Sequence, residues 1–252
     1  VGARAAPMGE ANAAVVTAAF YNFSPTVIEN GWSQALQAGL AEIDDHRYAM
    51  LAEQYGTILA GIDPAEIEAL AQGFGTVVDG LPLAGRALAS AWAASPVPDA
   101  PALALWRHVS VLREWRGDNH LAELIGHGLT GLEAGVFHEA DLPDPAVRRR
   151  VMGRRFFRIT RGWSEEQWGE AVARLTARGL VEGEPEAHRL TPEGMALYDE
   201  IEDEAPAPAA APSAPPAASA PGRRRSQQRP CKARADAFPA WRLHGPTHPR
   251  RG

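Results

Sequence analysis

The sequence predicts a mainly α-helical protein with a helical bundle region, a winged helix-turn-helix with a short two-stranded wing, and a disordered C-terminal tail. Apolar residues recur at helical spacing through residues 1–140. A helix, a short strand, a turn, a second short strand and a helix follow in residues 141–204. From Ala205 onward the chain is rich in proline, alanine and arginine. These changes divide the chain into residues 1–140, 141–204 and 205–252.

Two start signals mark helices in the first region. Ser24 and Asp63 each stand directly before a proline. A capping side chain followed by proline at the first helical position is typical of a helix start. Apolar stripes follow both signals, and "SPVPDAP" (95–101) is a rigid connector before the next stripe. Several amphipathic helices joined by short connections indicate a bundle.

The second region carries the winged helix-turn-helix pattern. Ser164 and Gln167 form a capping box, after which apolar residues recur every three or four positions as far as Leu175. A glycine in "RGLVEG" ends this helix, and the turn "EPEA" separates two short strands. Thr191 with Pro192 starts the last helix. This order of elements predicts a helix-turn-helix followed by a wing.

Charge is distributed unevenly along the chain. Residues 1–204 contain 16 Lys and Arg against 30 Asp and Glu, a net charge of −14, whereas residues 205–252 contain 9 against 1, a net charge of +8. The acidic body therefore lacks the overall field expected of a protein that coats nucleic acid. Ten of the 21 prolines fall in the basic tail, whose composition cannot bury enough apolar surface to offset its ordering entropy.

Cysteine usage and hydropathy exclude several classes of protein. The single cysteine, Cys231, lies in the tail, so residues 1–204 contain no disulfide framework, cysteine zinc cluster or cysteine nucleophile. This usage suits a reducing cytoplasm, which is the predicted location. No apolar run approaches 18 residues, so no membrane span is predicted.

A concentration of polar residues stands in "LREWRGDNHLAELIGHG" (112–128). The favoured interpretation is structural: a junction between two helices, in which Gly117 makes the turn and Asp118 caps the second helix. A metal site on one face, using His120, Glu123 and His127, is less favoured because the flanking glycines would end the helix there. The third interpretation is a polar ligand pocket lined by Tyr21, Asn22, Arg116, Asp118 and His120.

The motif "FYNFSP" (20–25) supplies the first two of those pocket residues. Tyr21 and Asn22 could line a pocket with hydroxyl and amide groups. The favoured interpretation is again structural, with Phe20 and Phe23 filling the core and Ser24 capping the next helix. No phosphate-binding loop or hydrolase motif is present, so the sequence nominates no catalytic residue, no metal ligand set and no cofactor.

Signals for DNA binding conflict. The predicted recognition helix begins with Glu165 and Glu166, which phosphates would repel, and the predicted wing is acidic as well. Seven arginines lie just upstream within fourteen residues, and arginine clusters contact phosphates well. Pairing of these arginines with the acidic body is an equally good interpretation. The candidate DNA contacts are Arg148, Arg149, Arg154, Arg155, Arg158 and Arg161.

Three stretches, "FYNFSP", "LREWRGDNHLAEL" (112–124) and "RGWSEEQW…LTARGL" (161–180), resemble an actinobacterial helix-turn-helix family often labelled SalK-like, with a MarR-like winged C-terminal part. The resemblance extends to about Glu204 and implies a fold and a lineage, but no reaction. It also implies a further helical segment upstream, so the first residues are expected to be an internal stretch of that segment. Two positions depart from the family's central motif, which usually has histidine and glycine there: Trp115 and Asn119.

Three functions follow as hypotheses. The first, favoured by the fold, is a DNA-associated transcriptional regulator that responds to a small molecule. The second is an enzyme or ligand-binding protein of secondary metabolism, with the winged helix as scaffold. The third is a dimerising interaction module without a site. The expected partners are accordingly DNA, a small-molecule ligand and a second copy in a homodimer, and no membrane.

Overall fold

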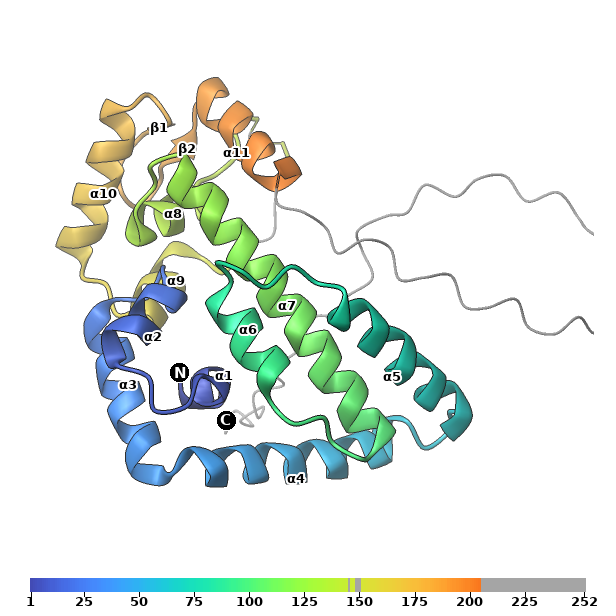
Figure 1. Cartoon of the computed structure of the whole chain (residues 1–252). Helices are drawn as coiled ribbons and strands as arrows, with labels where there is room; N and C mark the ends of the chain where they lie inside the picture. The colour runs from blue at the N-terminus through green and yellow to red at the C-terminus, as the bar shows by residue number, and fades with distance from the viewer. Residues whose placement is uncertain (145, 148–150, 205–252) are drawn as a thin grey trace, which may run out of the picture. The chain divides into compact units, whose positions relative to one another are not determined.

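The computed structural model describes residues 1–144, 146–147 and 151–204 (Figure 1). Within these ranges the protein is mainly α-helical with one two-stranded antiparallel sheet, so the predicted fold class is confirmed. The predicted tail, 205–252, lies outside the described residues. Among the described helices, none is both long enough and apolar enough to cross a membrane.

Two helices of the helical region begin at the predicted capping residues. Ser24 Oγ accepts the N–H of Val27, and Asp63 Oδ1 accepts the N–H of Ala65 at 3.0 Å, so both predicted helix starts are confirmed. Figure 1 shows α7 running between α5 and α6, and these two helices make its most extensive contacts. The elements are α1 (Gly2–Ala5), a 3₁₀ turn (Ala6–Met8), α2 (Ala13–Phe20), α3 (Pro25–Ala38), α4 (Leu40–Ile58), α5 (Pro64–Asp79), α6 (Ala87–Ala94) and α7 (Pro101–Gly126).

The predicted winged helix-turn-helix is present. Its helix-turn-helix is α9 and α10, joined through Gly162 in the left-handed conformation at φ 75°, where glycine is unstrained. The capping box of Ser164 and Gln167 starts α10, as predicted. β1 and β2 form the wing, with Val181 opposite Leu190. The elements are α8 (Gly131–His138), α9 (Arg154–Arg161), α10 (Glu165–Ala177), β1 (Val181–Glu182), β2 (Arg189–Leu190) and α11 (Pro192–Glu204).

The described residues contain three buried apolar clusters. α8 packs on α10 within one apolar cluster that extends from Leu124 to Ile201 and includes the wing. α8 and α9 cross so closely that a Cβ at Gly135 would lie 2.4 Å from the Phe157 ring. A second cluster joins α1, α2, α3 and α6 around Trp32, and a third joins α5, α6 and α7.

The helix α7 is uninterrupted, so the predicted junction at Gly117 and the predicted N-cap at Asp118 are wrong. Glycine inside a helix costs only about 1 kcal/mol, which packing against α5 and α6 offsets. A Cβ at Gly117 would approach nothing nearer than an Arg4 nitrogen at 4.0 Å. Asp118 still caps a helix, but the helix is α6: its Oδ2 accepts the N–H of Ala89 at 2.9 Å.

The "FYNFSP" motif fills its predicted structural role in part. Phe20 is buried in the second cluster, Phe23 packs against that cluster, and Ser24 caps α3, as expected. Tyr21 and Asn22 form the turn between α2 and α3 and lie at the edge of a cavity.

Candidate ligand-binding site

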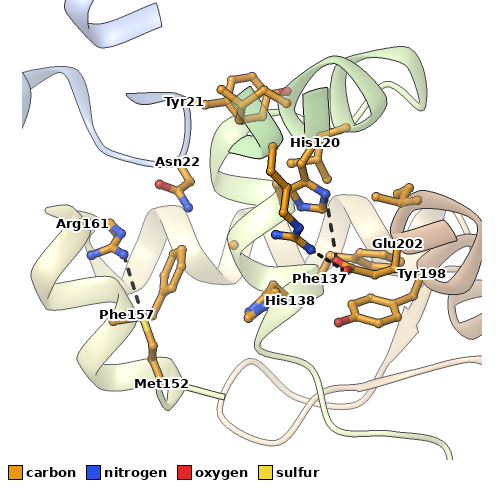
Figure 2. Close-up of a pocket in the computed structure, with 16 residues that line it drawn as sticks. Tyr21, Asn22, His120, Phe137, His138, Met152, Phe157, Arg161, Tyr198 and Glu202 are labelled. Carbon is orange, nitrogen blue, oxygen red and sulfur yellow. Dashed lines mark hydrogen bonds and ion pairs between the residues drawn. The ribbon is translucent and has the colours of Figure 1, made fainter. Parts of the chain in front are cut away.

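A cavity of about 390 Å³ lies where the α2–α3 turn, α7, α8, α9 and α11 converge (Figure 2). Its size suits a small ligand. Four of the five residues predicted for a ligand pocket line it: Tyr21, Asn22, Arg116 and His120. Other polar and aromatic side chains of its wall are Phe137, His138, Phe157, Arg161, Tyr198 and Glu202, together with Met152.

Asp118, the fifth predicted residue, faces away from the cavity. Arg116 and His120 are four residues apart in a continuous helix and share a face, whereas Asp118 is two residues from each and lies on the opposite side. There it is buried against α6. Burial raises the pKa of Asp118, although the hydrogen bond from Ala89 opposes the rise.

Tyr21 holds the α2–α3 turn against the start of α8. Its hydroxyl donates to the carbonyl of Leu129, and burial raises the pKa of the phenol. A Cβ at Gly131 would lie 1.9 Å from the Tyr21 carbonyl oxygen, so the turn touches the α8 backbone directly. Tyr21 also has φ 40°, the only positive value for a non-glycine residue in the described part of the chain. Backbone strain of this kind is concentrated at binding sites and active sites.

One end of the cavity is formed by α7 and α11. Glu202 accepts from Arg116 Nη2 at 3.4 Å, and its Oε1 lies 4.0 Å from His120 Nδ1. Burial lowers the pKa of His120, an effect that exceeds the opposing influence of Glu202. His120 Nδ1 is buried and has no hydrogen-bond partner among the described residues. A neutral imidazole with a free nitrogen is therefore available to a ligand.

The other end is formed by Arg161 of α9 and Asn22, seen opposite His120 and Glu202 in Figure 2. The Arg161 guanidinium lies 4.2 Å from the ring centroid of Phe23 and 5.3 Å from that of Phe157. Its hydrogen bonds are weak, at 3.3 Å to Thr160 Oγ1 and 3.8 Å to Met152 Sδ. Burial and then the positive charge of Arg4 lower the pKa of Arg161.

Glu139 is the acid with an electrostatic influence on Arg161, but its oxygens are already in use. They accept from the backbone N–H of Gly153 at 2.7 Å and of Met152 at 3.3 Å, and Oε1 lies 3.3 Å from His138 Nδ1. Burial alone would raise the pKa of Glu139, but these hydrogen bonds lower it. Arg161 consequently forms no ion pair with any described acid, and its Nε is buried without a partner.

A comparison with known protein families bears on this arrangement. The model of a helix-turn-helix family matches residues 1–237. The chain belongs to this helix-turn-helix family. No curated protein and no solved structure matches this family member.

The structure separates the predicted DNA contacts of this helix-turn-helix protein into different roles. Arg154 binds Asp141 at 2.8 Å and the carbonyl of His188 at 2.7 Å, which ties α9 to the wing, and Arg158 pairs with Glu165. Arg161 faces the cavity. Of the candidates that the structure describes, Arg155 alone is exposed and unpaired within the described ranges. Arg148 and Arg149 lie outside those ranges.

Glu202 and Tyr198 are cavity residues that the sequence pattern did not nominate as site residues. They lie four residues apart on one face of α11. The only local sign of their role is that the face formed by Tyr198 and Ile201 continues into Glu202. Nothing in the sequence joins Glu202 to Arg116, 86 residues away. The less favoured metal site does not form from His120, Glu123 and His127. In the described part of the chain, no group of three His, Cys, Asp or Glu residues could hold a metal ion.

Proposed function

We propose that this helix-turn-helix protein is a DNA-associated transcriptional regulator that responds to a small molecule bound in the cavity. The observation that carries the proposal is the shared wall: the cavity is lined both by the α2–α3 turn of the helical region and by α9 of the helix-turn-helix. The resemblance to the SalK-like group, with its MarR-like C-terminal part, supports this proposal.

Contacts beside the cavity supply the coupling. Trp163, in the turn between α9 and α10, donates from Nε1 to the carbonyl of Asn22 at 2.9 Å. The N–H of Ser24 donates to the carbonyl of Arg161 at 2.8 Å. A Cβ at Gly162 would lie 2.2 Å from a methyl of Val27. A ligand that displaces Tyr21 or Asn22 must therefore move the turn that orients α10.

The proposed DNA surface is the start of α9. Arg155 is exposed there, and Arg148 and Arg149 precede it in the sequence. Contacts from arginines to phosphates fix position and are independent of base sequence. Arg154 and Arg158 contribute to this surface indirectly, since they hold α9 to the wing and to α10.

A second candidate function is favoured by the acidity of α10 and the wing, the elements that normally bind in the grooves of DNA. Glu165 and Glu166 are exposed at the start of α10, and Glu184 and Glu186 are exposed in the wing. Each would be repelled by phosphates. The second candidate is therefore a ligand-binding protein, or an enzyme of secondary metabolism, in which the winged helix serves as scaffold.

DNA binding at several salt concentrations separates the two candidates. The full chain and a chain ending at Ala214, which lacks the arginines of the predicted tail, would be titrated with labelled duplex DNA by fluorescence anisotropy. We expect log K to fall with log salt with a slope of several units in both chains, because each neutralised phosphate contributes about 0.9. Arg155→Gln should reduce the slope by about one unit.

Arg113→Gln is the matched control, since Arg113 is an exposed arginine of α7 outside α9. Its salt slope should equal that of the unmodified chain. Absence of binding at low salt by the chain ending at Ala214 would contradict the regulator and favour the second candidate.

A further inference from the structure

We infer that the cavity binds an organic monocarboxylate with a flat apolar body, and that Arg161 binds its carboxylate. This inference deepens the proposed function and rests on the cavity being a ligand site. Three properties of the cavity carry it: the state of Arg161, the distribution of charge between the two ends, and the side chains that lie between them.

Arg161 is half-buried and has no anionic partner among the described residues. Buried charges are paired in most proteins, because an unpaired one loses its hydration without compensation. Among the described residues Arg161 Nε has no acceptor, and the other two nitrogens reach a hydroxyl and a thioether there. The rings of Phe23 and Phe157 hold the guanidinium in place. A guanidinium fixed in this way presents parallel N–H donors that match a carboxylate.

Charge along the cavity predicts a single negative group at the Arg161 end. Arg161 carries one positive charge without an ion pair to a described acid, whereas Arg116 at the other end is paired with Glu202. One guanidinium balances a carboxylate, whereas a phosphate dianion needs further donors. Glu202 would repel a second carboxylate. The ligand therefore lies with its acid toward Arg161 and its other end toward His120 and Glu202.

The side chains between the ends favour an apolar, flat body. Phe137, Phe157 and Tyr198 line the cavity together with Leu121 and Leu124. Aromatic side chains prefer stacked or edge-on contact with flat partners. A volume of about 390 Å³ lies near the lower end of the range for small-molecule sites, roughly 300–1,000 Å³. A small arylalkanoic acid suits a cavity of this size.

Paired acid and amide probes test the inference directly. Phenylacetate and 3-phenylpropanoate, each with its neutral amide, would be titrated into the full chain by isothermal calorimetry at constant ionic strength, with inorganic phosphate as a third anion. We expect the better acid to bind at least tenfold more tightly than its amide, and phosphate to bind more weakly than either acid. Arg161→Gln should abolish the preference for the acid, and Arg113→Gln, a matched change at an exposed arginine outside the cavity, should leave it unchanged.

The outcomes separate this inference from the proposed function. Equal binding of acid and amide, a preference for phosphate, or an acid preference that survives Arg161→Gln would overturn the inference and leave a neutral-ligand site intact. If no probe binds at 10 mM, the inference is overturned, whereas the proposed function is decided by the DNA titration. The comparison of acid with amide in the unmodified chain needs no variant, so it holds even if Arg161→Gln does not fold.

Discussion

Polar side chains lie on two faces of α7 around residues 114–120, but their hydrogen bonds are complete on one face and incomplete on the other. On the face toward α6, Asp118 accepts the N–H of Ala89, and Asn119 bonds to both Arg86 and the carbonyl of Trp115. On the face toward the cavity, Arg116 reaches Glu202 only at 3.4 Å and His120 Nδ1 has no partner among the described residues.

This difference shows which part of a charged motif is structural. Groups whose hydrogen bonds are complete hold helices together, and their loss leaves buried partners without bonds. Groups with spare donors or acceptors beside a cavity are the candidates for ligand contact. Trp115 and Asn119 fit the same division, because Trp115 donates to the carbonyl of Pro82 and Asn119 accepts from Arg86 on the structural face.

The largest expected effect is on the structural face. Asp118→Ala should lower the free energy of unfolding by about 2 kcal/mol, because the buried N–H of Ala89 loses its acceptor. The melting temperature should fall by about 4–8 °C. Calorimetry measures both. Asp118→Asn, which keeps an acceptor, should lose less than half as much, and His120→Ala on the cavity face should stay within about 2 °C of the unmodified chain. If His120→Ala proved the more destabilising, the assignment of faces would be wrong.

A second, smaller effect concerns pH. Burial lowers the pKa of His120 below that of the unfolded chain, so the unfolded state binds more protons in the window between the two values. Stability contributed by neutral His120 is therefore present above about pH 6.5 and is lost as the pH falls toward the lowered pKa. Buried His188 in the wing contributes with the same sign. Urea titrations at several pH values should show the decline.

Glu202→Gln separates the contribution of His120 from that of His188. Glu202 raises the pKa of His120, so its neutralisation should lower that pKa further and leave the pKa of His188 unchanged. Histidine ring signals followed by NMR report both values. A rise in the pKa of His120 would contradict the described geometry.

The sequence was sufficient for features set by neighbouring residues and insufficient for those set by distant ones. Ser24, Asp63 and Ser164 cap helices from one to three positions away, so their roles were predictable. The continuity of α7 through Gly117 depends on packing against two other helices. The sequence predicts a turn at Gly117 instead, and with it a pocket that includes Asp118. The inward orientation of Arg161 likewise depends on Phe23, which lies in another region of the chain.

The smallest expected effect tests the helix itself. Gly117→Ala should raise the free energy of unfolding by about 0.5–1 kcal/mol, because alanine favours the helix and no atom obstructs its Cβ. Chemical denaturation of the two proteins measures the difference. A clear loss of stability would mean that residue 117 needs the freedom of glycine, as the predicted junction requires and a continuous helix does not.

The most direct test of the division between the faces is a backbone NMR titration of the full chain with 3-phenylpropanoate. We expect saturable shifts at Tyr21, Asn22, His120 and Arg161 that continue into Gly162 and Trp163, with Ala89 and Asp118 unmoved. Shifts centred on Ala89 and Asp118, or shifts at the cavity that stop before Gly162, would contradict this expectation.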